Sequence, residues 1–121
     1  MNPKRTVIWF STVSIILILF GILFAFFGLG ILPVQREVLL QWESALYGAI
    51  MMGWGTTLFL LGRLAMQRRD TDLMKALLYG ITVWLVIEGL FSAYLGVWFN
   101  VGVVIGIWVL FSIPLIRNIR R

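Results

Sequence analysis

The sequence predicts an all-α membrane protein: one domain over residues 1–121, folded as a four-helix transmembrane bundle with the N and C termini in the cytoplasm. Three observations lead to this prediction. Of the 121 residues, 61% are hydrophobic and 12% are charged, whereas soluble domains have about 45–50% apolar residues. The charges fall into clusters that are separated by apolar stretches of membrane-crossing length. Nearly all Lys and Arg residues lie on one side of the resulting layout.

The first half of the chain contains two charge-free stretches, and each predicts one span. A bilayer core about 30 Å thick requires roughly 20 residues of helix at about 1.5 Å each. The first stretch predicts a span over about 6–32. It ends before Pro33, because proline lacks the amide hydrogen that would continue the helix. The second stretch predicts a span over about 43–65.

The second half of the chain predicts a helical hairpin. The stretch 76–116 contains a single charge, Glu88, and is about twice the length of one crossing, which predicts spans over about 73–95 and 101–116. The uncharged residues expected to join these two spans are Trp98, Phe99 and Asn100. The residues expected to cap the third span, by accepting a hydrogen bond from its first free amides, are Asp70, Thr71 and Asp72.

The positions of Lys and Arg predict the orientation, because positively charged loops stay in the cytoplasm. Cations precede the first predicted span, join the second to the third and follow the fourth, and only Arg36 lies on the other side. We therefore expect a multi-pass protein of the bacterial cytoplasmic (inner) membrane, with anionic lipid headgroups at the cytoplasmic face among its partners. The first apolar stretch is too long for a signal peptide, so this span is expected to stay in the mature protein.

The composition excludes several classes of chemistry. The chain has no Cys and no His, which excludes disulfides, thiolate or imidazole metal sites and Ser-His or Cys-His nucleophile pairs. We expect no cofactor, no metal and no enzymatic activity. The net charge of +5 does not predict nucleic-acid binding, because the cations flank membrane spans instead of forming a separate basic helix.

Small residues recur at spacings that favour close packing of helices. Lipid tails are as apolar as Leu, so spans associate where small residues let backbones approach. A period of seven residues places such a stripe on one face of each of the first three spans, and a GxxxG pair marks the fourth. The predicted packing positions are Gly21, Gly28, Gly48, Gly55, Gly62, Gly89, Gly96, Gly102 and Gly106. Packing inside the protein is favoured, and contact with a second copy or a ligand is the alternative.

Glu88 is the ionisable side chain deepest in a predicted span, where a carboxylate is costly, so it should point away from lipid. Five further residues are expected near it, by helical spacing or by depth: Trp84, Ser92, Tyr47, Asn100 and Arg36. This set is a candidate site for a proton, a cation or a lipophilic ligand. The alternative is that Glu88 is a neutral acid, hydrogen-bonded to Ser92 or Tyr47, that holds helices together.

Three tryptophans, Trp54, Trp84 and Trp108, fall in the middle of predicted spans instead of at the membrane boundary. A buried indole requires a partner for its N–H. We expect these rings to fill space against glycine-rich grooves, and the alternative is that they line an apolar pocket.

The glycine-rich run LYGAIMMGWGTTLFLLGR over 46–63 follows a long first apolar stretch and precedes a basic loop and a tight hairpin. This pattern resembles DoxX-like and related small four-span bacterial membrane proteins. The resemblance covers the chain at the level of architecture, and it implies a four-span fold without implying an activity. The chain is also similar to small multidrug resistance transporters in length and intramembrane Glu. That family's essential Glu lies in the first span, which is uncharged here, so no functional residue is carried over.

These observations predict a structural or accessory membrane protein that packs against a partner or against itself. The alternative function is a small transporter or lipophilic-ligand binder that uses Glu88 as a proton or cation site.

Overall fold

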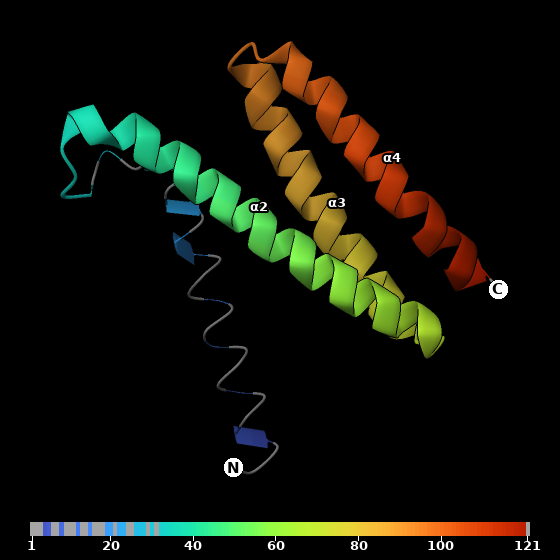
Figure 1. Cartoon of the computed structure of the whole chain (residues 1–121). Helices are drawn as coiled ribbons and strands as arrows, with labels where there is room; N and C mark the ends of the chain where they lie inside the picture. The colour runs from blue at the N-terminus through green and yellow to red at the C-terminus, as the bar shows by residue number, and fades with distance from the viewer. Residues whose placement is uncertain are drawn as a thin grey trace. The chain divides into compact units, whose positions relative to one another are not determined.

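The computed structural model describes residues 4, 5, 8, 12, 15, 19, 20, 22, 23, 26–28, 30 and 32–120. Within these residues the chain is helical apart from short turns, and it contains no strand. Three helices follow one another, namely α2 (Arg36–Gln67), α3 (Thr71–Tyr94) and α4 (Trp98–Arg120) (Figure 1). All three are long and apolar enough to cross a membrane.

The prediction of a four-helix bundle is wrong. The described part of the chain has three helices of membrane-crossing length and composition, not four, and the helices that pack along their length are α3 and α4. More than half of the residues of the predicted span over 6–32 lie outside the described residues. The absence of charges shows only that a stretch can lie in the hydrocarbon core of a membrane. It does not show which helices pack against each other.

The chain forms two compact units, Met1–Met51 and Met52–Arg121. Helix α2 begins in the first unit and ends in the second. The second unit holds the last part of α2, the whole of α3 and α4, and the buried core. The residues that position the candidate sites described below therefore lie mainly in this unit.

Helix α2 begins seven residues before the predicted boundary at Glu43. Its 32 residues correspond to about 48 Å of helix, which exceeds the thickness of a bilayer core. The extra turns contain charged and polar residues, and Glu37 in the first turn complements the helix dipole. The boundary differs because apolarity is required only inside hydrocarbon, whereas the backbone continues as a helix beyond it.

The turn between α2 and α3 is a Schellman motif that passes directly into a helix cap. The amide of Arg69 donates to Met66 O at 3.3 Å and the amide of Asp70 donates to Ala65 O at 2.9 Å, which satisfies carbonyls at the end of α2. Arg69 has a φ of 53°, the left-handed conformation that this motif requires. Asp70 Oδ1 then accepts a hydrogen bond from the amide of Leu73 at 3.0 Å, so its predicted capping role is confirmed.

The turn between α3 and α4 is a second Schellman motif. The amide of Gly96 donates to Ala93 O at 3.1 Å, and the amide of Val97 donates to Ser92 O at 2.7 Å. Gly96 has a φ of 78°, a conformation that costs residues with a Cβ atom roughly 1–2 kcal/mol. Because α4 begins at Trp98, the connection is shorter than the sequence predicts. The residues expected to form it belong to the first turn of α4.

Helix α4 extends past its predicted end at residue 116 to Arg120, and it contains Pro114 in its interior. The side-chain amide of Asn118 donates to Pro114 O at 2.7 Å. Arg117 and Arg120 occupy the last turn, where positive charge is favourable next to the free carbonyls of a helix end. The charged turn is therefore part of the helix, although it is too polar to belong to an apolar span.

The buried core lies where the last part of α2 meets α3, and between α3 and α4. Figure 1 shows α3 and α4 side by side and antiparallel, joined by the short turn. The α3 residues of the core recur at spacings of three and four, which places them on one face of that helix. The buried apolar side chains are Leu58, Ala65, Met74, Leu77, Ile81, Leu85, Val104 and Leu115.

Candidate functional site

The structure distributes the residues predicted to surround Glu88 over both units of the chain. Arg36 and Tyr47 lie on α2 in the first unit, and both side chains are exposed. Glu88 lies on α3 in the second unit, where its side chain is half-buried. Trp84 and Ser92 are one helical turn before and after it, as expected from their spacing.

Ser92 is held by the start of the next helix. The side-chain amide of Asn100 on α4 donates to Ser92 Oγ at 2.8 Å. Two of the residues predicted for the Glu88 site are therefore in contact with each other. The bond spans the α3–α4 turn, so it fixes the geometry of the hairpin next to the Schellman motif.

Trp84 packs against a tryptophan from α2. The Trp54 and Trp84 rings meet edge to face, with centroids 6.3 Å apart and planes at 85°. This arrangement is favourable because the positive edge of one ring meets the negative face of the other. Both rings are half-buried against the core. Trp54 and Trp84 therefore pack against each other beside the core, whereas Trp108 lines an apolar groove.

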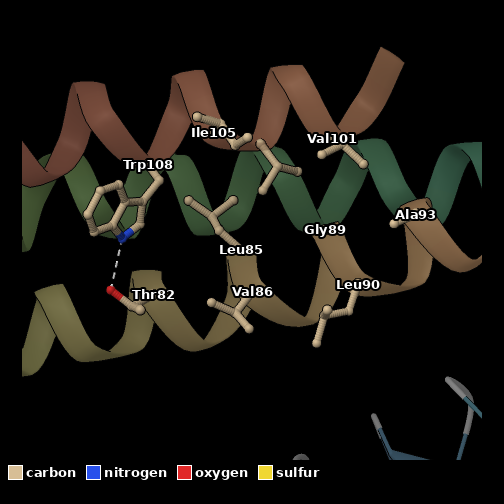
Figure 2. Close-up of a pocket in the computed structure, with 10 residues that line it drawn as sticks. Thr82, Leu85, Val86, Gly89, Leu90, Ala93, Val101, Ile105 and Trp108 are labelled. Carbon is tan, nitrogen blue, oxygen red and sulfur yellow. Dashed lines mark hydrogen bonds between the residues drawn. The ribbon is translucent and has the colours of Figure 1, made fainter. Parts of the chain in front are cut away.

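An apolar groove of about 440 Å³ lies between α3 and α4, as Figure 2 shows. Leu85 and Trp108 extend into the space between the two helices. Glu88 is not among the residues that line this groove. The lining residues are Thr82, Leu85, Val86, Gly89, Leu90, Ala93, Val101, Val104, Ile105 and Trp108.

The polar side chains of this groove hydrogen-bond to each other. The indole N–H of Trp108 donates to Thr82 Oγ1 at 3.0 Å (Figure 2). The Thr82 hydroxyl donates in turn to Leu78 O at 2.7 Å. The indole therefore has the partner that a tryptophan away from water requires, and Thr82 connects the two helices.

Gly89 is the predicted packing glycine that approaches a second helix. A Cβ atom at this position would lie 3.5 Å from Val104 Cγ1, an ordinary van der Waals contact. At the other predicted glycines that the structure describes, a Cβ atom would meet nothing within 4 Å among the described residues. These positions are Gly28, Gly48, Gly55, Gly62, Gly96, Gly102 and Gly106. Gly21 lies outside the described residues.

A second groove, of about 320 Å³, lies between the last part of α2 and the α3–α4 hairpin. Its single charged lining residue is Arg63. The guanidinium carbon of Arg63 lies 5.4 Å from the centroid of the Phe59 ring, which also lines the groove. The remaining lining residues are Leu58, Gly62, Met66, Leu77, Ile81, Leu110, Phe111, Pro114 and Leu115. We call this surface the α2–α3–α4 groove.

Two buried polar atoms have no hydrogen-bond partner among the described residues, namely Trp54 Nε1 and Ser112 Oγ. Ser112 is 2% exposed and lies on the face of α4 that meets the core. Such atoms reduce stability, because they lose hydrogen bonds to water without replacement.

No group of three or more Asp, Glu, Cys or His side chains that would hold a metal ion occurs in the part of the chain that the structure describes. The sequence interpretation omitted Thr82 and Arg63 as site residues. Thr82 lies seven residues before Gly89, so its spacing predicts only a small packing residue, and Arg63 is one of the cations between the second and third predicted spans.

The chain matches no protein-family model, no curated protein and no solved structure. Its functional interpretation therefore rests on the geometry described above.

Proposed function

We propose that this chain is a multi-pass protein of a bacterial cytoplasmic membrane with a structural or accessory role, and that it packs against a second copy or a partner helix through one face of α4. The ends of α3 and α4 next to the basic α2–α3 turn lie on the cytoplasmic side, because positive loops are retained there. Three helices of membrane-crossing length support the membrane assignment.

The observation that carries the proposal is the position of the GxxxG pair on α4. Gly102 and Gly106 are exposed, and a Cβ atom at either would meet no described atom within 4 Å. Val109 and Ile113 continue the same helical face and are also exposed. This surface (Gly102, Gly106, Val109 and Ile113), here called the α4 glycine face, provides the smooth contact that right-handed helix pairs use in membranes.

The α3–α4 groove favours packing over substrate recognition. Binding pockets for small molecules combine apolar walls with a few polar groups that orient the ligand. Here the polar side chains are Thr82 and Trp108, and each already forms a hydrogen bond with the other. A polar substrate would have to break that bond to be recognised.

The alternative function, a transporter or lipophilic-ligand binder based on Glu88, has less support. Glu88 lines neither the α3–α4 groove nor the α2–α3–α4 groove. Ser92 and Asn100, which were expected to join its site, hydrogen-bond to each other.

Site-specific photo-crosslinking in native membranes tests the packing proposal. A photoreactive amino acid at Val109 on the α4 glycine face should form a discrete protein adduct, either with a second copy or with one membrane protein. The matched position is Val83 on α3, which is 59% exposed and lies outside the α4 glycine face. It should yield lipid adducts only.

A substitution that obstructs the face provides the second arm. Gly106→Leu should reduce the adduct at position 109 severalfold, because a bulky side chain prevents close backbone approach. Gly80→Leu alters an exposed glycine on α3 with equally open surroundings and should leave the adduct unchanged. Lipid adducts alone at position 109, or equal effects of both substitutions, contradict the proposal.

A further inference from the structure

We infer that the α2–α3–α4 groove is a binding site for one anionic phospholipid, with the phosphate against Arg63 and an acyl chain between the three helices. The inference rests on the membrane insertion included in the proposed function. It does not depend on packing through the α4 glycine face, which lies outside the groove.

The shape and chemistry of the groove fit an acyl chain. Its walls come from three helices of membrane-crossing length, and they consist of aliphatic, aromatic and methionine side chains apart from Gly62 and Arg63. Leu58, Leu77 and Leu115, which line it, are buried side chains. A volume of about 320 Å³ with no hydrogen-bonding side chain besides Arg63 admits a hydrocarbon chain and offers nothing to a polar one.

Arg63 provides the charge complementarity that selects the headgroup. Its guanidinium lies over the Phe59 ring, and a cation over an aromatic face keeps its in-plane N–H donors available at the sides. No carboxylate in the described residues pairs with Arg63. The planar guanidinium binds phosphate oxygens through two parallel hydrogen bonds, so the free donors at the groove are suited to a phosphodiester.

Most of the charged residues at the same end of the helices as Arg63 are also positive. Arg68 and Arg69 follow Arg63 in the α2–α3 turn, and Arg117 follows the groove residue Leu115 by two positions on α4. The carboxylates of this end are Asp70 and Asp72, and Asp70 is engaged as the cap of α3. The excess of cations raises the local concentration of anionic lipid. Among these cations, Arg63 is the one that lines the apolar groove.

Native mass spectrometry of the purified full chain tests the site. The protein is taken from nanodiscs that contain equal amounts of phosphatidylglycerol and phosphatidylcholine, and the ratio of the two lipid adducts is measured. The wild-type chain should retain one phosphatidylglycerol in preference to phosphatidylcholine. Arg63→Gln should lower this ratio by more than about tenfold, because it removes charge-assisted hydrogen bonds to the phosphate in addition to a surface cation.

Arg117→Gln is the matched control, because it removes an equal charge from the same end of the molecule without altering the groove lining. Arg117→Gln should change the logarithm of the lipid ratio by less than half of the change that Arg63→Gln causes. An equal decrease in both variants indicates general electrostatic attraction, and it overturns the site. An unchanged ratio in Arg63→Gln also overturns it.

Gly62→Leu tests the acyl chain separately. Gly62 lines the groove, and a Cβ atom there would meet nothing within 4 Å, so the added side chain enters the groove without a clash. The variant keeps every charge and should nevertheless lose the retained lipid, while Gly80→Leu should keep it. Retention of the lipid in Gly62→Leu, with helicity unchanged by circular dichroism, overturns occupation of the groove.

Competition with soluble glycerol phosphate distinguishes a bound lipid from a phosphate site. An excess of glycerol phosphate in the solution should leave the phosphatidylglycerol adduct in place, because the headgroup alone lacks the acyl chain. Displacement of the lipid by glycerol phosphate contradicts the inference. Packing through the α4 glycine face is measured by crosslinking at position 109, so either result can fail while the other stands.

Discussion

Trp108 on α4 donates its indole N–H to Thr82 Oγ1 on α3 at 3.0 Å. The bond joins residues 26 positions apart in the sequence and crosses the α3–α4 groove near one of its ends (Figure 2). It therefore ties the two arms of the hairpin together at a distance from the turn, where the Asn100–Ser92 bond joins them a second time.

A double-mutant cycle should detect the Trp108–Thr82 bond as a coupling energy. Trp108→Phe and Thr82→Val each remove one partner, and the expected coupling is about 0.6 kcal/mol, since hydrogen bonds between membrane helices average that value. Reversible unfolding in mixed micelles measures it. The control cycle pairs Trp108→Phe with Thr57→Val, whose hydroxyl bonds within α2, and should give no coupling. Equal coupling in both cycles would mean that the bond contributes nothing specific.

Gly96 should be intolerant of a side chain. Gly96→Ala places a Cβ atom at a φ of 78°, and it should reduce the free energy of unfolding by roughly 1–2 kcal/mol. Gly80→Ala is the control, because Gly80 lies inside α3 with open surroundings and alanine is favoured there by about 0.5–1 kcal/mol. Stability that is lower in Gly80→Ala than in Gly96→Ala would contradict the assignment of the turn.

Arg69→Gly should stabilise the protein although it removes a charge. Arg69 adopts a φ of 53°, which costs a residue with a Cβ atom about 1–2 kcal/mol, and glycine avoids that cost. Arg68→Gly removes the same charge from the neighbouring position, where φ is not positive, and it should not stabilise the chain. A higher midpoint of thermal unfolding for Arg69→Gly alone is the expected result, and equal midpoints would refute the role of backbone strain.

Ser112→Ala should leave stability unchanged or increase it by about 1 kcal/mol, because the mutation deletes a buried hydroxyl that lacks a described partner. Ser92→Ala is the comparison, since Ser92 accepts a hydrogen bond from Asn100 and its loss should cost about 0.5–1.5 kcal/mol. Chemical unfolding of both variants in the same detergent measures their free energies of unfolding and shows which variant is more stable. A larger loss for Ser112→Ala would show that its hydroxyl is satisfied in the membrane.

Glu88→Gln separates the proposed function from its alternative. The substitution keeps the size of the side chain and removes its charge. If the protein has a structural or accessory role, crosslinking from position 109 and binding of the lipophilic cation tetraphenylphosphonium should be unchanged at acidic and neutral pH. A pH-dependent binding of this cation that disappears in Glu88→Gln would instead establish Glu88 as the proton or cation site.

Much of the second half of the chain was predictable from local rules. The spans expected over 73–95 and 101–116 correspond to α3 (Thr71–Tyr94) and α4 (Trp98–Arg120), and the cap at Asp70 follows from residue type and position. The errors have physical causes. Charged or polar turns remain helical outside hydrocarbon, as α2 shows before Glu43. Gly96 was expected to pack against a helix, but its conformation places it in a turn.

The candidate site was harder to predict than the helices. Helical spacing correctly places Trp84 and Ser92 one turn from Glu88 on α3. It gives no information about partners on other helices, so it did not reveal the Trp54–Trp84 contact or the Asn100–Ser92 bond. Glu88 does not line the α3–α4 groove or the α2–α3–α4 groove, and its role as a proton or cation site stays a prediction.

The amino-acid sequence by itself determined that the chain contains helices suited to a membrane, where three of them lie, and which of their ends are basic, because hydropathy and charge are summed over local stretches. Only the tertiary structure decided that α3 and α4 form the packed pair, that Thr82 receives the Trp108 indole, and that Arg63 borders an apolar groove. These features depend on contacts between residues far apart in the chain, and in an environment as apolar as the side chains hydrophobicity does not select which faces meet.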